Sequence, residues 1–256
     1  ILMKIVILAG GLGTRLSEET RNIPKPMVKI GNYPILYHIM KYYSKFNHKN
    51  FIICTGYKAN EIKKFFIDLK IQNSDITINF KSNRTKIYNS EKIDWNVNII
   101  NTGELSQTGA RIKKIKKFIG KDENFLMTYG DGLSNVDIKK LIEFHKKHKK
   151  IATMTSVRPL ARFGNITLKG SKITNFSEKD SLQEGWINGG FFVLNKKIFN
   201  YIDNSELSIF ERDTLPLLAK NNQLMAFKHY DFWHPMDTLR DKITLNEIYK
   251  RKKHKW

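Results

Sequence analysis

A glycine-rich loop near the N-terminus has residue types suited to binding phosphate groups. Gly10, Gly11 and Gly13 follow a short apolar run, and Arg15 stands two residues further on. Glycines let the backbone approach a phosphate and turn its N–H groups towards it, and a guanidinium can donate two parallel hydrogen bonds. The loop lacks the Gly-Lys-Ser/Thr ending of a Walker A motif, and Leu16 stands where the dinucleotide fingerprint needs its third glycine. By itself the loop fits a phosphate site and a tight strand-to-helix turn equally well.

A lysine between two prolines supplies a second cation. Pro24 and Pro26 fix the backbone on either side of Lys25 and remove two backbone donors. Such a segment favours a lysine held in one place, ten residues after Arg15, where both cations can meet the same polyphosphate. The alternative is one more surface lysine on a stiff loop.

Two aspartates stand in loops that could face this phosphate site. Asp131 follows a predicted buried strand and lies between glycines, and Asp237 lies in a loop rich in aromatic residues. A single aspartate of this kind is most often a turn residue or a helix cap. Two that converged would repel each other unless a cation lay between them. Their spacing in the sequence does not establish that they converge.

The apolar pattern predicts the elements that position these residues. Short apolar runs at residues 4–9, 51–55 and 124–128 are typical of strands buried on both faces. Apolar residues at helical spacing predict helices at 34–46 and 61–69 and a third after Ser134. We expect Ser134 to be the N-cap of that third helix, with Asp137 completing a capping box.

The second half of the chain is richer in predicted strands. They fall at residues 151–156, 172–176, 189–194 and 224–229, with helices near 197–202, 212–220 and 241–250. Strands interleaved with helices favour a parallel sheet covered on both faces. We therefore predict an α/β fold, with a mostly parallel central sheet flanked by helices and a small antiparallel lobe in the C-terminal half.

Length and composition exclude several classes of protein. The chain has 256 residues, of which 41% are hydrophobic, so it can bury a sizeable core and is not expected to be disordered. No apolar run reaches the 18 residues that a membrane span requires. Cys54 is the only cysteine, which excludes an intrachain disulfide and a zinc cluster and leads us to expect a reducing, cytoplasmic location.

The net charge of +21 suggests nucleic acid or an anionic membrane as a partner. However, 36 of the 45 cations are lysines, whereas phosphate clamps and base readers favour arginine. The lysine runs at 113–117, 139–150 and 250–255 fall where helices have solvated faces. We therefore expect neither nucleic acid nor membrane as a partner.

Several segments, taken in order, resemble one family. The first is Leu8-Ala9-Gly10-Gly11-Leu12-Gly13-Thr14-Arg15-Leu16, followed by Thr20 and Pro24-Lys25-Pro26. The others are Gln107-Thr108-Gly109-Ala110-Arg111, Tyr129-Gly130-Asp131-Gly132, Trp186-Ile187-Asn188-Gly189-Gly190-Phe191-Phe192 and Phe232-Trp233-His234-Pro235-Met236-Asp237-Thr238-Leu239-Arg240-Asp241. Together they resemble the sugar-phosphate nucleotidyltransferases, in particular the cytidylyl branch, from Met3 to about Tyr249.

This resemblance implies a Rossmann-like nucleotidyltransferase sandwich and a reaction. Residues 1–256 would form a single domain, in which 3–150 bind the nucleotide, 151–249 bind the sugar phosphate and 250–256 are a basic tail. The implied enzyme condenses CTP with α-D-glucose 1-phosphate to give CDP-glucose and pyrophosphate, with Mg²⁺ as cofactor. The sugar phosphate attacks the α-phosphorus directly and in line. Because this nucleophile is already anionic, no histidine is assigned a catalytic role.

The resemblance also assigns residues to sites. Those implied in catalysis are Arg15, Lys25 and Asp131, and the implied metal ligands are Asp131 and Asp237. Those implied in nucleotide binding are Leu8, Ala9, Gly10, Gly11, Leu12, Gly13, Thr14, Arg15, Lys25, Ser106, Gly109, Arg111 and Gly130. Those implied in sugar-phosphate binding are Tyr129, Glu178, Lys179, Asn188 and Gly189.

Alternatives remain for parts of this assignment. Residues 106–111 could simply lead into a basic helix at 111–118, and Gly189 could mark a β-bulge. The same reaction could use UTP, dTTP or GTP, or another sugar 1-phosphate. A non-catalytic nucleotide-sugar-binding subunit is a further alternative, against which the presence of Arg15, Lys25, Asp131 and Asp237 together argues. The family also implies a homo-oligomer and a place in surface-polysaccharide synthesis.

Overall fold

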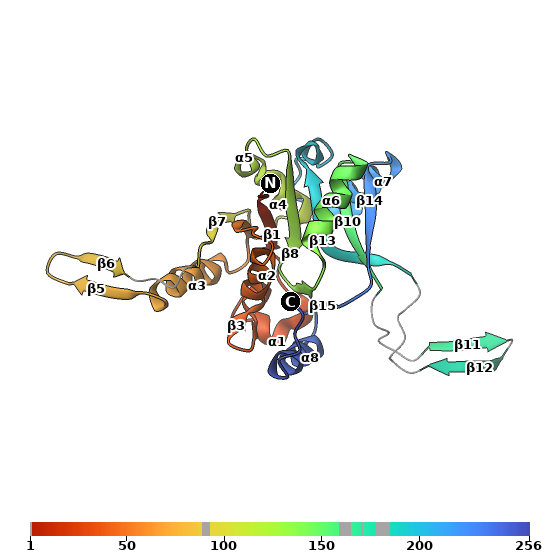
Figure 1. The fold of residues 1–256 in the computed structure, drawn as a ribbon, viewed down its shortest axis with the longest axis horizontal. Coiled ribbons are helices and arrows are strands. Elements are labelled where there is room, and N and C mark those ends of the chain that lie inside the picture. The colour runs from red at the N-terminus through yellow and green to blue at the C-terminus, as the bar shows by residue number, and fades with distance from the viewer. Residues whose placement is uncertain (1, 89–92, 159–164, 170, 178–184) are drawn as a thin grey trace.

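A seven-stranded sheet runs through the middle of the molecule (Figure 1). The structure is a computed structural model that describes residues 2–88, 93–158, 165–169, 171–177 and 185–256. In spatial order the strands are β14 (Leu224–His229), β10 (Ala152–Val157), β13 (Ile187–Asn195), β8 (Asn124–Tyr129), β1 (Ile5–Ala9), β4 (Asn50–Thr55) and β7 (Asn96–Asn101). Neighbours are parallel except at β13, which is antiparallel to β10 and to β8. The predicted mostly parallel sheet is confirmed.

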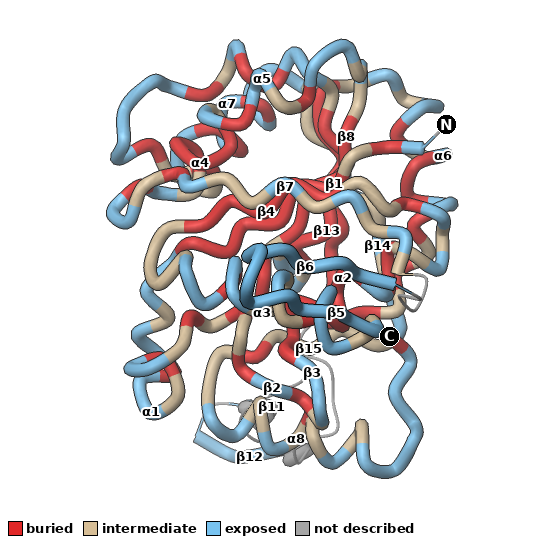
Figure 2. The backbone as a smooth tube through the Cα atoms, turned by 90° about the vertical axis from the view of Figure 1, so that its left-hand side faces the viewer, coloured by how far each residue is buried: buried red, intermediate tan, exposed pale blue. Residues whose placement is uncertain are grey.

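Strand β1 shows why the sheet is covered on both faces. Ile5, Ile7 and Ala9 belong to one apolar cluster, and Val6 and Leu8 belong to another. Because alternate side chains of a strand point to opposite faces, a strand between two layers needs apolar residues throughout. In Figure 2 the inner strands β1, β4, β8 and β13 form the buried centre of the molecule.

Helices supply the two covering layers. The first cluster contains residues of α2 (Ile35–Ser44), α6 (Ile138–His148) and α8 (Leu239–Lys250), and the second contains residues of α4 (Thr108–Lys114), α5 (Lys116–Ile119) and α7 (Leu215–Lys220). The other helices are α1 (Ser17–Thr20) and α3 (Ala59–Gln72), and short strands are β2 (Lys29–Ile30), β3 (Tyr33–Pro34), β9 (Gly132–Ser134) and β15 (Trp233–Pro235). The helix predicted near 197–202 is a 3₁₀ helix at Lys196–Asn200, and α7 is preceded by a π-helical turn at Phe210–Thr214.

The predicted start of α6 was wrong. Its N-cap is Asp137, whose side chain accepts a hydrogen bond from the Lys140 backbone N–H at 3.0 Å. Ser134 lies at the end of β9 instead, and its hydroxyl donates to the Phe232 carbonyl at 2.8 Å. Ser134 therefore takes part in strand pairing, although the local sequence favoured it as a helix cap.

Two antiparallel hairpins project from the body on opposite sides (Figure 1). One pairs β11 (Asn165–Lys169) with β12 (Lys172–Ser177) and supplies the antiparallel element expected in the C-terminal half. The other, β5 (Asp75–Asn79) with β6 (Arg84–Tyr88), was not predicted and is exposed along both strands.

The basic C-terminal segment folds back onto the body. Trp256 is buried, stacks on Phe232 with ring centroids 5.3 Å apart, and donates its indole N–H to His38 Nδ1 at 3.3 Å. Lys255 pairs with Asp231 at 2.6 Å. This segment therefore backs the loop that leads into β15. No helix among the described residues has the length and apolar character needed to cross a membrane.

Candidate active site

The glycine loop leaves the carboxyl end of β1 and turns back at Gly13. Gly13 has a φ of +66°, a left-handed conformation in which a side chain is strained, and a Cβ there would lie 2.9 Å from the Thr20 side chain. Thr20 Oγ1 lies 3.1 Å from the Gly13 carbonyl oxygen and 3.0 Å from that of Leu16, so it closes the loop from behind. The glycine loop, which by sequence fitted both a turn and a phosphate site, is thus a tight turn whose outer side is open.

A cavity of about 310 Å³ opens in front of this loop. Tyr129 and Asp131 line it. So do most of the residues predicted to bind the nucleotide, which are Leu8, Ala9, Gly10, Gly11, Gly13, Thr14, Arg15, Lys25, Ser106, Arg111 and Gly130. Pro26, Gln107 and Thr108 line it as well and were not predicted. Leu12 is largely exposed, and Gly109 packs against Ser208, so neither belongs to the wall.

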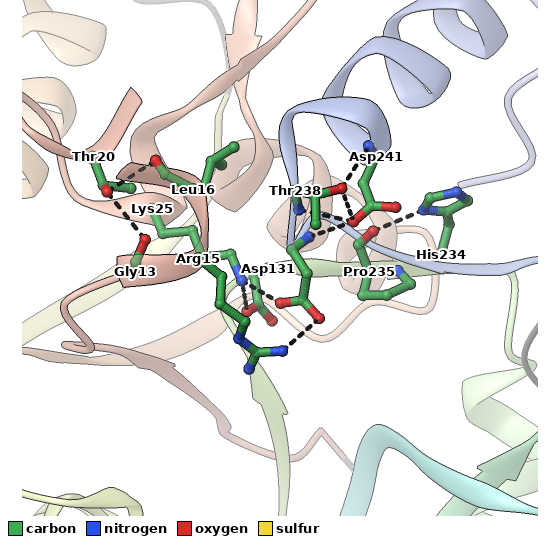
Figure 3. A network of polar contacts seen from close by, with 11 residues as sticks. Gly13, Arg15, Leu16, Thr20, Lys25, Asp131, His234, Pro235, Thr238 and Asp241 are labelled. Carbon is green, nitrogen blue, oxygen red and sulfur yellow. Dashed lines mark hydrogen bonds and ion pairs between the residues drawn. The ribbon is translucent and has the colours of Figure 1, made fainter. Parts of the chain in front are cut away.

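Lys25 lies between the two predicted metal ligands (Figure 3). Its ammonium group donates to Asp131 Oδ2 at 2.7 Å and to Asp237 Oδ1 at 2.6 Å. The two carboxylate oxygens are therefore no further apart than the sum of these distances. The lysine side chain is only 12% exposed, whereas those of Asp131 and Asp237 are 31% and 19% exposed. The three residues form a charged cluster at the mouth of the cavity.

Pairing of β9 with β15 explains how two distant aspartates meet. Gly132 pairs with Pro235, so Asp131 precedes one strand of this short ladder and Asp237 follows the other. The Met236 backbone N–H donates to the Asp131 carbonyl at 2.8 Å and extends the contact by one residue. On the far side, Thr238 caps α8 through a capping box with Asp241, and this fixes the direction in which the chain leaves Asp237.

The cluster stabilises the charged form of Lys25. Burial acts to lower the pKa of this lysine, but the Asp131 and Asp237 carboxylates more than offset it, and the pKa lies above its ordinary value. The lysine is thus a permanent cation at neutral pH. Arg15 joins the cluster more loosely, through one contact of 3.3 Å from Nη1 to Asp237 Oδ2, and its side chain is 76% exposed. Arg15 is therefore available to an incoming anion.

The donor set of this cluster fits a hard divalent cation. Two carboxylates from different loops converge on one point, and Mg²⁺ typically takes one or two carboxylates and completes its shell with substrate phosphates and water. Within the described residues, no group of three His, Cys, Asp or Glu side chains gathers anywhere as a ready-made metal cage. The fit is thus to a cation shared with a phosphate ligand.

Arg111 is buried and holds three loops together. Its guanidinium donates to the carbonyls of Gly10 at 2.8 Å, Thr55 at 3.1 Å and Gly103 at 2.7 Å. Gly10 and Gly103 lie just after β1 and β7, and Thr55 is the last residue of β4. It also reaches Thr102 Oγ1 and the Glu104 carbonyl. A Cβ on Gly10 would collide with this guanidinium. Arg111 thus shapes the cavity wall, and its direct contact with a nucleotide base stays a prediction.

Ser106 is also engaged within the protein. Its hydroxyl lies within hydrogen-bond distance of the Thr102 carbonyl and of Glu206, and Lys114 donates to it at 3.0 Å. Lys114 pairs with Glu206 at 2.6 Å, and its hydrogen bond to this carboxyl holds the Glu206 pKa below its usual range. Lys114 is therefore a structural cation rather than one more solvated lysine.

Those residues predicted to bind the sugar phosphate that the structure describes lie around Tyr129. Asn188 Nδ2 donates to Tyr129 Oη at 3.0 Å, and Tyr129 Oη donates to Glu211, a residue that sequence analysis missed. Gly189 has no room for a side chain, because a Cβ would lie 2.9 Å from Val157. Glu178 and Lys179 lie outside the described residues.

The histidines make structural contacts. His38 Nε2 lies 2.8 Å from the Ile30 carbonyl, His229 Nε2 lies 3.1 Å from that of Phe232, and His234 Nδ1 lies 2.7 Å from that of Pro235. His145 is buried far from the cavity, at the amino end of β8.

Comparison with known proteins finds one family throughout. The model of the nucleotidyl transferase family matches residues 4–251. The chain is 48% identical over 254 residues to glucose-1-phosphate cytidylyltransferase of Salmonella typhimurium, covering 99% of this chain and 98% of that protein. It is 39% identical to probable glucose-1-phosphate cytidylyltransferase of Bacillus subtilis, with 99% of both chains covered. Among solved structures, HddC from Yersinia pseudotuberculosis matches with a TM-score of 0.70 and 27% identity over 97% of this chain and all of that chain.

Proposed function

The chain belongs to the nucleotidyl transferase family, and we propose that it condenses CTP with α-D-glucose 1-phosphate to give CDP-glucose and pyrophosphate. The observation that carries this proposal is the cluster of Lys25, Asp131 and Asp237 at the mouth of the glycine-loop cavity. It supports a site for two anionic reactants and a cation. The near full-length similarity to two glucose-1-phosphate cytidylyltransferases supports the choice of base and sugar.

The main obstacle to this reaction is the repulsion between two polyanions. A sugar phosphate is already an anionic nucleophile, so its attack on the α-phosphorus needs no general base. Positioning and charge neutralisation must supply the rate enhancement. Lys25 and Arg15 are suited to this task, one fixed and the other exposed, and each charge-assisted hydrogen bond to a phosphate contributes about 1.5–3 kcal/mol.

Asp131 and Asp237 are proposed to hold Mg²⁺. When bound, the ion supplies a Lewis acid beside the phosphate oxygens. The two carboxylates are already oriented by the β9–β15 ladder, so little rearrangement is needed to present them together. Lys25 contacts both carboxylates, so it would share them with the ion and could donate to the phosphate groups that become pyrophosphate.

A panel of nucleotides tests the proposal. Purified protein with Mg²⁺ and glucose 1-phosphate should release pyrophosphate fastest with CTP and much more slowly with UTP, dTTP and GTP. Equal or faster release with UTP would contradict the cytidylyl assignment and leave the reaction type intact. No release with any triphosphate, despite CTP binding measured calorimetrically, would favour a non-catalytic binding protein.

We also propose that the enzyme acts in the cytoplasm as a homo-oligomer. A location in the cytoplasm is supported by Cys54, a buried free thiol, because disulfides are rare in reducing compartments. The β5–β6 hairpin exposes Ile78 and, at its turn, Phe80, which is 90% exposed, and such side chains favour contact with another protein surface. Light scattering should give a mass above 30.0 kDa, reduced by Phe80→Ser. A monomeric mass for the wild type would contradict the proposal.

A further inference from the structure

Glu211 joins residues on both sides of the cavity although it does not line it. It lies in the π-helical turn Phe210–Thr214, and π-turns often occur at functional sites. Its Oε2 accepts a hydrogen bond from Thr108 Oγ1 at 2.6 Å, and its Oε1 accepts one from Tyr129 Oη. Thr108 and Tyr129 both line the cavity. One carboxylate thus holds two wall residues that come from different elements.

On the sugar side, Glu211 sets the direction of a chain of hydrogen bonds. An ionised carboxylate can only accept hydrogen bonds, so Tyr129 must donate its hydroxyl hydrogen to Glu211. The tyrosine oxygen then has only lone pairs to offer, and Asn188 must present its NH₂ group, which donates at 3.0 Å. This orientation leaves Asn188 Oδ1 to accept from the Gly190 backbone N–H at 2.9 Å. The amide of Asn188 is therefore fixed from both ends.

The Tyr129 ring has little freedom to escape this arrangement. Gly190 has a φ of +80°, and a Cβ at that position would lie 2.6 Å from the Tyr129 ring. The backbone of β13 thus packs directly against the ring. The phenol is thereby held in place, with its hydroxyl between Glu211 and Asn188.

On the nucleotide side, Glu211 fixes the first turn of α4. Thr108 Oγ1 donates to Glu211 and accepts from the Phe210 backbone N–H at 2.9 Å. The next residue, Gly109, donates its N–H to the Ser208 carbonyl at 2.9 Å. Residues 208–211 therefore hold the start of α4 in place. Within the described part of the chain, Glu211 is the only one of these residues that also contacts Tyr129.

We propose that Glu211 is a positioning residue that orients Asn188 for the sugar phosphate and Thr108 for the nucleotide, and so couples the recognition of the two substrates. This inference rests on the proposed function. If the proposal holds, sugar selectivity depends on a carboxylate that need not touch the sugar. Reversing the direction of these hydrogen bonds would turn the Asn188 NH₂ group against the Gly190 N–H.

Glu211→Gln tests this directly. The glutamine amide has one acceptor and one donor group, so it can no longer accept from both hydroxyls. We expect kcat/KM for glucose 1-phosphate to fall at least about tenfold, and its ratio over the galactose and mannose epimers to narrow by about threefold or more. The matched control is Asp213→Asn in the same turn, whose carboxylate accepts from the Ile209 N–H and from Arg212 and lies away from the cavity. The control should retain wild-type kinetics and selectivity.

A double-substitution cycle separates positioning from general structural support. Tyr129→Phe breaks the same chain one step later, so it should narrow sugar selectivity by itself even if Glu211→Gln folds poorly. With Tyr129→Phe already present, Glu211→Gln should have little further effect on sugar selectivity but should still raise the KM for CTP through Thr108. Effects on selectivity that multiply independently would overturn the proposal, as would a Glu211→Gln enzyme that behaves like Asp213→Asn.

Failure of the proposed function looks different. It would appear in the wild type, as turnover of another nucleotide or sugar phosphate in place of CTP and glucose 1-phosphate. The same variants compared on that other pair would still decide whether Glu211 positions the two sides.

Discussion

Strand β8 has a polar cluster at each end, and the two clusters balance charge in different ways. At the carboxyl end, Asp131 lies with Lys25 and Asp237 in a group of full charges. At the amino end, Asn124 belongs to a network that includes His145. The strand has six residues, so about 20 Å separates the two clusters. Both border a cavity, yet only one suits the proposed chemistry.

The amino-end network is neutral and closed. The Lys150 N–H donates to His148 Nδ1, and His148 and His145 both contact Thr153 Oγ1, at 2.7 and 2.8 Å. His145 Nε2 lies 3.2 Å from Asn124 Oδ1. A consistent set of donors runs from His148 through Thr153 to His145 and on to Asn124 only if both histidines are uncharged. Burial lowers the pKa of His145 to about 4 and favours this state.

The difference teaches that cavity size is a poor guide to function. The amino-end cavity is about 650 Å³, roughly twice the 310 Å³ of the glycine-loop cavity. In the larger cavity the buried polar groups are already matched to one another. In the smaller cavity, partly exposed charged side chains pair with one another, and a phosphate and a cation can take the place of these partners.

The largest expected effect comes from removing one charge at the carboxyl end. Asp237→Asn keeps the size of the side chain but leaves Asp131 as the only carboxylate beside Lys25. We expect turnover to fall about a hundredfold or more, with the Mg²⁺-dependent rise in melting temperature in the presence of CTP also lost. Asp231→Asn, which alters an exposed carboxylate before β15, is the control. Full activity of Asp237→Asn would remove this residue from the metal site and break the comparison.

The next effect concerns the wall of the glycine-loop cavity at the carboxyl end. In Arg111→Lys, a compact ammonium replaces a planar guanidinium that donates to carbonyls at the carboxyl ends of β1, β4 and β7. We expect the free energy of unfolding to fall by about 3–4 kcal/mol and the KM for CTP to rise about tenfold. Urea denaturation and initial rates measure the two changes, with the exposed Arg212→Lys as reference. An unchanged KM alongside lower stability would confine Arg111 to a structural role.

The amino-end network should respond to acid. Because the folded-state pKa of His145 lies below its ordinary value of 6.5, its contribution to stability is complete above that pH and is lost as the pH falls towards 4. The loss should reach about 3 kcal/mol. His145→Gln should be less stable at pH 7 and should show a flatter decline between pH 6.5 and 4, as measured by urea midpoints. Parallel slopes for the two proteins would show that the network does not require neutral histidines.

The smallest effect tests whether the lysines near the amino end serve the nucleotide. Lys146 and Lys197 line the larger cavity, about two Debye lengths from the glycine loop at physiological ionic strength. The double variant Lys146→Gln, Lys197→Gln should therefore change the KM for CTP less than about twofold. A larger rise would mean that the overall positive charge steers CTP into the site.

The sequence predicted those parts of the site that follow directly from buried strands. The glycine loop after β1 and Asp131 after β8 lie at the cavity because short apolar strands place them there, and Lys25 lies there in a 3₁₀ turn that begins after Pro24. The meeting of Asp131 with Asp237 depends on the β9–β15 ladder, whose three-residue strands leave no periodic signal. The same ladder includes Ser134, which the local sequence pattern predicted to be a helix cap.

Other features could not be predicted because their partners are backbone atoms or single residues. The family resemblance assigned Arg111 to nucleotide binding, but in the structure its guanidinium donates to carbonyls at three strand ends, which no spacing reveals. Glu211 stands in a turn without any motif. Strand β7 was not predicted because it is an edge strand with partly exposed side chains, and Asn96, Asn98 and Asn101 interrupt its apolar run.

The short ladder that joins Gly132 to Pro235 has a consequence for synthesis on the ribosome. The first 150 residues carry the glycine loop, Lys25 and Asp131, and can pair β1 with β4 and β8 while the rest of the chain is still being made. Asp237 arrives only about a hundred residues later. A nascent chain therefore holds Lys25 with a single carboxylate, and the charged cluster is complete only after Asp237 has been added.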